Sequence, residues 1–154
     1  MDVITSSHNS SRPAPAPSRV WRLSVRTPAD HAYGFIIDLK CLHHWAKVFH
    51  DKAYGPEKLA AMSPEDALEE LEVSLGYTSV ALQRMVYRAL PHIPRLRHRL
   101  VLMSPADETW LLVLKDNSSH ATITTTITPE DIESVRKLIG LGDQRPLWYR
   151  LPSW

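Results

Sequence analysis

Five arginines in the middle of the chain are the side chains best suited to bind an anionic ligand. All lie in a stretch without acidic residues, from 73 to 106, and they are Arg84, Arg88, Arg95, Arg97 and Arg99. The planar guanidinium group suits phosphate and carboxylate, and Tyr87 supplies a ring for stacking. These residues therefore predict a basic surface for an acidic peptide, RNA or anionic lipid headgroups.

An acidic block stands before these arginines. Residues 57–72 hold six acidic side chains and a single lysine, Lys58. Sorted charge of this kind creates local fields that bias association, but it does not select a fold. Two interpretations follow. Either the glutamates pair with the arginines inside the folded molecule, or the arginines stand together in solvent and bind a partner.

The C-terminal residues 144–154 (QRPLWYRLPSW) are the second candidate for binding. They include Trp148, Tyr149 and Trp154. Burying one large apolar side chain stabilises a protein by about 1.5–3 kcal/mol, so a water-exposed tail seldom keeps two tryptophans. We expect this tail either to fold back on its own domain or to anchor in a partner. Tryptophan, tyrosine and arginine are enriched in interface hot spots, which makes these residues partner-binding candidates.

Metal ligation has only weak candidates. Cys41 and His44 are three residues apart and could chelate an ion as a pair. On a helix, His43 and His50 share a face but lie about 10 Å apart along the axis. Two ligands do not make a site, and no second ligand pair follows. We therefore predict neither a metal nor a cofactor.

Nucleophilic catalysis has no assembled pattern. Ser119 and His120 lie close to Asp116, but neighbours in one turn cannot place an imidazole between a hydroxyl and a carboxylate. The apolar neighbours of Cys41 would raise the pKa of its thiol. No P-loop, G-x-G-x-x-G or G-x-S-x-G motif occurs. We therefore predict no catalytic residue.

The first half of the chain predicts one strand and then helices. Alternating apolar residues favour a half-buried strand over 20–26. Thr27 and Pro28 suit a helix start, and apolar spacings of three and four extend this helix to about His50. The β-rich Phe35–Ile37 leaves open a strand followed by a shorter helix.

Two further helices follow, after a short one over 56–62. Ser63 and Pro64 begin the first, which Gly76 ends. The second spans about 78–90, and the prolines after it stop it.

The second half predicts a three-stranded meander and a last helix. The strands are expected over 95–103, 109–115 and 121–127. In the first strand, the odd-numbered arginines would point to one side. The final helix begins at Thr128 and ends at one of two glycines, Gly140 or Gly142.

These elements predict an α+β fold with an antiparallel sheet of three or four strands. The order is β-ααα-βββ-α, with helices packed on one face. The chain has 154 residues, of which 44% are hydrophobic, and this suits one domain with a real core. We assign it to 19–143, after a disordered Ser/Pro/Ala-rich arm over 1–18 and before the aromatic tail over 144–154.

The location follows from what the sequence lacks. Cys41 is the single cysteine, so no intrachain disulfide forms and the small secreted class is excluded. No run is apolar enough for a signal peptide or a membrane span. We expect a cytoplasmic or nuclear protein. Arginines and serines without acids over 3–29 keep a mitochondrial location as the alternative.

The function that the sequence favours is a non-enzymatic adaptor. The basic surface and the aromatic tail would bind a macromolecular partner, in particular an acidic protein. The net charge of +1 is low for a nucleic-acid binder, so an RNA-binding module is the second interpretation. The third is a small enzyme of an unfamiliar family, with a pocket around His43, His44 and Asp38.

Overall fold

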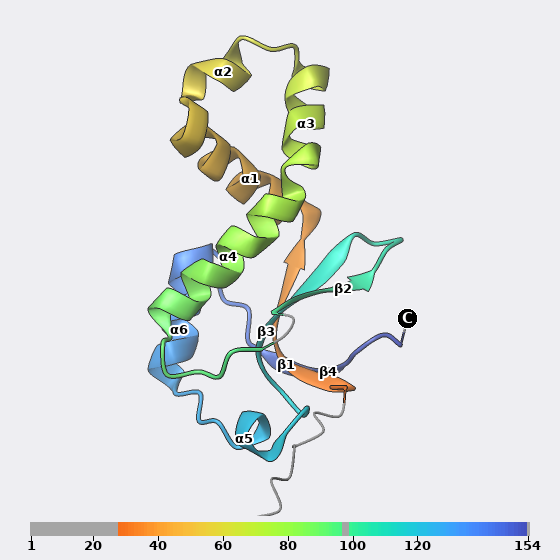
Figure 1. Cartoon of the computed structure of the whole chain (residues 1–154), viewed down its shortest axis with the longest axis vertical. Helices are drawn as coiled ribbons and strands as arrows, with labels where there is room; N and C mark the ends of the chain where they lie inside the picture. Colours follow the sequence, from red (N-terminus) through yellow and green to blue (C-terminus); the bar gives the residue numbers. More distant parts are fainter. Residues whose placement is uncertain (1–27, 97–98, 154) are drawn as a thin grey trace, which may run out of the picture.

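The protein has an α+β fold built on a four-stranded antiparallel sheet (Figure 1). This is seen in a computed structural model that describes residues 28–96 and 99–153. In chain order the elements are β1 (His31–Asp38), α1 (Leu39–Tyr54), α2 (Pro56–Ala60), α3 (Pro64–Val73), α4 (Leu75–Ala89), β2 (Leu100–Ser104), β3 (Thr109–Asp116), α5 (His120–Ile123), α6 (Pro129–Ile139) and β4 (Leu147–Arg150). The predicted fold class is confirmed.

The strands lie in the order β2-β3-β1-β4. A bulge interrupts the pairing of β1 with β3 between Tyr33 and Gly34. A Cβ atom added to Gly34 would lie 1.9 Å from the backbone oxygen of Leu112. Only glycine therefore lets the two strands approach this closely.

The main core lies between the sheet and the helices α1, α4 and α6. Phe35 and Ile37 from β1 join Leu112 and Leu114 from β3 in this layer. The helices contribute buried apolar residues to it, among them Leu42, Leu82, Val86, Val135 and Ile139. Alternation along β3 sends Leu111 and Val113 to the opposite face, where they form a smaller cluster with Ala32.

The helices α2 and α3 extend away from the sheet (Figure 1). α3 buries no residue. Polar contacts join it to α1 and α2: His50 Nε2 of α1 lies 3.2 Å from Glu70 Oε1, and Lys58 Nζ of α2 lies 3.6 Å from the same oxygen. α3 therefore presents most of its surface to solvent.

The single helix predicted up to His50 is wrong, and the alternative of a strand followed by a helix is correct. Phe35 and Ile37 bury their side chains in β1, and the Asp38 carboxylate accepts a 2.8 Å hydrogen bond from the backbone N–H of Cys41. This N-cap starts α1 where the strand ends. The predicted strand over 20–26 and the arm over 1–18 lie outside the described residues.

The third strand predicted over 121–127 is also wrong. Ser119 and Thr122 form a capping box that starts the short helix α5, and an irregular segment connects it to α6. The fourth strand is instead β4, which lies within the aromatic tail over 144–154. Gly76 does not end a helix, because Ser74 joins α3 to α4 and Gly76 lies inside α4.

The C-terminal tail folds back on its own domain, one of the two expected outcomes. β4 pairs antiparallel with the first half of β1, where Tyr149 is opposite Ala32. Farther along β1, the Gln144 side chain takes the place of a paired strand. Its Oε1 accepts a 2.6 Å hydrogen bond from the Ile36 N–H, and its Nε2 donates one of 2.9 Å to the Ile36 oxygen.

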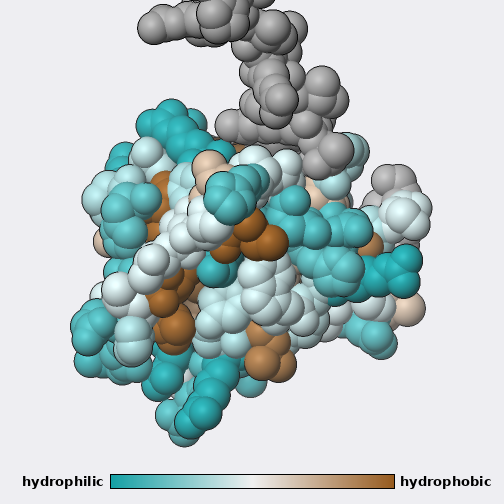
Figure 2. Space-filling model, turned by 90° about the horizontal axis from the view of Figure 1, so that it is seen from below, coloured by the Kyte–Doolittle hydropathy of each residue, from teal (hydrophilic) through white to brown (hydrophobic). Residues whose placement is uncertain are grey.

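The helices within the described residues are all too short or too polar to cross a membrane. Figure 2 views the molecule from below the orientation of Figure 1. Hydrophobic residues appear there as separate patches between hydrophilic ones. The described part of this face therefore offers no continuous apolar surface.

Candidate functional site

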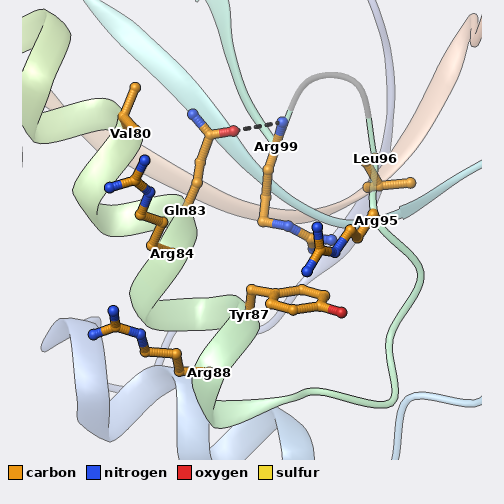
Figure 3. A pocket seen from close by; sticks show the side chains of 8 residues that line it. All are labelled: Val80, Gln83, Arg84, Tyr87, Arg88, Arg95, Leu96 and Arg99. Atoms are coloured by element: carbon orange, nitrogen blue, oxygen red, sulfur yellow. Dashed lines mark hydrogen bonds between the residues drawn. The ribbon is translucent and has the colours of Figure 1, made fainter.

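The predicted arginines gather around one open cavity of about 380 Å³, which we call the arginine groove (Figure 3). It lies between α4 and the segment that leads into β2. Its lining residues are Val80, Gln83, Arg84, Tyr87, Arg88, Arg95, Leu96 and Arg99. Four of the five predicted arginines and Tyr87 are among them, whereas Arg97 lies outside the described residues.

The helix α4 supplies the first pair of arginines because one of its faces is buried and apolar and the other is exposed. Leu82 and Val86 point into the core and are at most 1% exposed. Arg84 and Arg88, one helical turn apart, are exposed. In Figure 3 their guanidinium groups lie to one side of α4, away from those of Arg95 and Arg99.

The second pair lies beside the ring of Tyr87. The Arg95 guanidinium carbon is 4.7 Å from the ring centroid, a cation–π contact that orients an otherwise exposed side chain. The strand predicted over 95–103 begins only at Leu100. Arg95 and Arg99 therefore both lie before β2 and are not placed by the alternation of a strand.

Arg99 is the unusual member of the site because it is only 4% exposed. Its Nη1 donates a 2.8 Å hydrogen bond to the Val113 oxygen, and its Nη2 donates one of 2.6 Å to the Pro94 oxygen. Burial lowers the pKa of Arg99 to about 10, an effect that the charge of Asp116 partly opposes. The protein thus holds a desolvated cation at the wall of the groove, where a bound anion would stabilise it.

The acidic block does not neutralise these arginines in the described part of the chain. No ion pair there joins Arg84, Arg88, Arg95 or Arg99 to a carboxylate. Within that block, Glu70 pairs with His50 and Lys58 instead. The lining of the groove includes no acidic residue. The groove is therefore positively charged on its own.

Three residues of the lining are not predicted from the sequence: Val80, Gln83 and Leu96. Gln83 accepts a 3.1 Å hydrogen bond from the Arg99 backbone N–H through its Oε1 and so fixes the start of the following strand against α4. Val80 and Leu96 are the apolar walls. No signal in the sequence marks Gln83, since its partner is a backbone group.

The aromatic tail does not belong to the same surface. β2, which follows the groove, is at one edge of the sheet, and β4 is at the other. Trp148 is 45% exposed, and its ring centroid lies 5.7 Å from that of Tyr33. Tyr149 packs on the second core cluster, and Trp154 lies outside the described residues. The tail and the groove are thus separate candidates.

The weak metal candidates do not form a larger site. The described residues contain no group of three or more histidine, cysteine or acidic side chains that could hold an ion. His44 is exposed and packs edge-on against Trp45. Burial and the Asp38 charge raise the pKa of the Cys41 thiol to about 11, which disfavours the thiolate that binds metals and attacks substrates.

The other catalytic candidates have structural roles. Asp38 is the N-cap of α1. The Asp116 carboxylate accepts hydrogen bonds from the backbone N–H and the hydroxyl of Ser118, at 3.0 and 2.6 Å, which form the turn after β3. Ser119 caps α5. These contacts hold the side chains in local structure, and the charge of Asp116 also acts on Arg99.

Comparison with known proteins gives no match for this chain among protein-family models, curated proteins or solved structures.

Proposed function

We propose that this protein is a non-enzymatic adaptor that binds an acidic segment of a partner protein in the arginine groove. One observation carries the proposal. Arg99 is a buried cation that no carboxylate pairs with in the described part of the chain, and it lines the same groove as Arg84, Arg88 and Arg95. A carboxylate from outside would form charge-assisted hydrogen bonds with guanidinium groups, roughly twice as strong as neutral ones.

The shape and lining of the groove favour a peptide over RNA. Single-stranded RNA is held by stacking its bases on aromatic rings. The ring that lines this groove, Tyr87, already stacks with Arg95. Val80 and Leu96 add apolar walls, which suit the side chains that flank acidic residues in a peptide.

Fluorescence anisotropy with a defined probe tests this function. The probe is a fluorescein-labelled peptide of about ten residues, rich in glutamate and with two leucines, and its control replaces each glutamate with glutamine. We expect the glutamate peptide to bind and the triple variant Arg84→Ser, Arg88→Ser, Arg95→Ser to bind at least about tenfold more weakly. The buried Arg99 is left intact so that the fold is preserved.

A matched variant controls for net charge. The triple variant Lys52→Ser, Arg145→Ser, Arg150→Ser removes three exposed basic side chains outside the groove, the same change in net charge, and should bind the peptide like the wild type. Equal losses in both variants, or equal binding of the glutamine peptide, would contradict the proposal. A single-stranded RNA that bound tighter than the peptide, with steep salt dependence, would favour the RNA-binding alternative.

A further inference from the structure

A second surface of opposite charge lies on α3. Glu65, Glu69 and Glu72 are exposed and, at spacings of four and three, share one face of the helix. In the described part of the chain, none of these three glutamates forms an ion pair. The molecule thus carries an acidic helix and a basic groove that do not satisfy each other internally.

The two helices also expose apolar side chains. Val73 at the end of α3 is 79% exposed, and Tyr77 and Val80 on α4 are 64% and 44% exposed. Tyr77 and Val80 fall on the same side of α4 as Arg84 and Arg88, given the helical spacing of 3.6 residues per turn. Exposed apolar residues next to unpaired charges are typical of an interaction surface.

The sequence of charged and apolar residues along α3 is complementary to the sequence along α4. On α3 the residues at spacings of four are Glu65, Glu69 and Val73; on α4 they are Val80, Arg84 and Arg88. Each step of four residues advances about 6 Å along a helix axis. If α3 of one molecule runs antiparallel to α4 of another, each glutamate faces an arginine and Val73 faces Val80.

We propose that α3 of a second copy of this chain docks on α4, so that the protein associates with itself through these two helices. The register that pairs Glu65 with Arg88 and Glu69 with Arg84 is reciprocal. It pairs α4 of the first copy with α3 of the second by the same residues. Reciprocal contacts of this kind close a two-fold dimer, the commonest symmetry of homo-oligomers.

Near the centre of this pairing lie Gly76 and Tyr77. A Cβ atom added to Gly76 would meet nothing within 4 Å, so the space beside it is open. In the register above, Tyr77 of one copy comes opposite Gly76 of the other. A large exposed ring thus meets a residue without a side chain, which lets the helices approach each other.

Charge reversal tests the pairing. One variant carries Glu65→Arg and Glu69→Arg, and the other carries Arg84→Glu and Arg88→Glu. Each variant alone brings like charges together at both contacts, so we expect a monomer. An equal mixture brings opposite charges together at both contacts, so we expect a one-to-one dimer. Sedimentation velocity at low salt measures the mass against the 17.5 kDa of one chain.

The wild type should form a dimer at low salt. The dissociation constant of this dimer should rise at least about tenfold as sodium chloride rises from about 0.05 to 0.5 M. Far-ultraviolet circular dichroism verifies that each variant keeps its helices. Should a reversed variant unfold, the neutral pair Glu65→Gln and Glu69→Gln replaces it, and the expected result is then a weaker dimer. A wild type that stays monomeric at low salt, or a mixture that does not associate, would overturn the inference.

This inference shares Arg84 and Arg88 with the proposed adaptor function, so peptide binding is also measured on the variant Glu65→Gln, Glu69→Gln, whose groove is unchanged and whose weaker dimer leaves these arginines free. Measured in this way, the two proposals fail separately. Peptide binding without self-association would support the adaptor function and contradict the dimer. Self-association without peptide binding would do the reverse.

Discussion

Arg99 and Val113 are joined twice. The Arg99 guanidinium donates a 2.8 Å hydrogen bond to the Val113 backbone oxygen, and the Val113 backbone N–H donates one of 2.6 Å to the Arg99 backbone oxygen. A third hydrogen bond leads from the guanidinium to Pro94. One side chain thus connects the wall of the arginine groove to the central strand β3, and it is structural as well as a candidate for binding.

Replacing Arg99 with alanine should therefore destabilise the fold. The change removes two hydrogen bonds and leaves the buried carbonyl of Val113 and the partly buried carbonyl of Pro94 without their donor. We expect a loss of about 2–4 kcal/mol in the free energy of unfolding. Urea denaturation followed by tryptophan fluorescence measures it. Arg88→Ala, at an exposed position of the same groove, should change stability by less than about 0.5 kcal/mol, and equal losses would contradict the structural role of Arg99.

Two glycines should respond to alanine in opposite ways. Gly34→Ala would force its Cβ against the backbone oxygen of Leu112, where the strands cannot separate without losing their pairing. We expect a cost of at least about 2 kcal/mol. Gly76→Ala, inside α4 and in open space within one chain, should stabilise the monomer at about 0.5 M sodium chloride by about 0.5–1 kcal/mol. Thermal unfolding of the two variants measures both, and a neutral Gly34→Ala would contradict the close approach of β1 and β3.

Cys41 should react slowly with alkylating reagents. Burial and the nearby charge of Asp38 raise the pKa of its thiol to about 11, whereas a free cysteine has a pKa near 8.5. At about pH 8 the folded protein should hold at least about 100-fold less thiolate than the unfolded chain. Iodoacetamide labelling with and without urea, followed by mass spectrometry, measures the ratio. Equal rates would contradict the buried setting of this thiol.

Asp131 should make the protein sensitive to acid. Burial raises the pKa of its carboxyl, but hydrogen bonds from the Thr128 backbone and from the His92 side chain outweigh this effect and lower the pKa below its ordinary value of 3.8. The unfolded chain therefore binds the proton first as the pH falls. The stability that Asp131 contributes is fully present above about pH 4 and is lost as the pH falls through the pKa of the folded state.

The substitution Asp131→Asn tests this pH dependence. The fall in the urea midpoint between about pH 6 and pH 3 should be smaller in the variant than in the wild type. Glu130→Gln, a neighbouring exposed position, is the control and should keep the wild-type slope. Identical slopes for all three proteins would refute the role of Asp131.

The sequence carried enough information for the fold class and for most helices. The caps at Ser63 and Thr128, each followed by proline, marked the starts of α3 and α6 correctly. The failure at 121–127 has a physical cause, because serine and threonine side chains offer the backbone an alternative to a strand. Thr124 and Thr125 donate hydrogen bonds to the backbone oxygens of His120 and Ala121, at 2.7 and 2.8 Å.

Tertiary contacts determine the secondary structure of two segments for which the local sequence pattern is not sufficient. Apolar residues lie on both faces of β1, so Ala32, Phe35, Ile36 and Leu39, at spacings of three and four, also fit a helix. Pairing with β3 makes this segment a strand. β4 is a strand because β1 offers it an edge. The gathering of Arg84, Arg88 and Tyr87 follows from helical spacing, whereas the inward turn of Arg99 depends on carbonyl groups that no sequence pattern reveals.

The placement of β4 has a consequence for handling this protein. Its four residues occupy the backbone donors and acceptors of β1 from His31 to Gly34. If proteolysis removed residues 147–150, that row of N–H and C=O groups would be open to strands of other molecules, the usual starting point of aggregation. Shortened preparations should therefore precipitate more readily than the intact chain, even where the core remains folded.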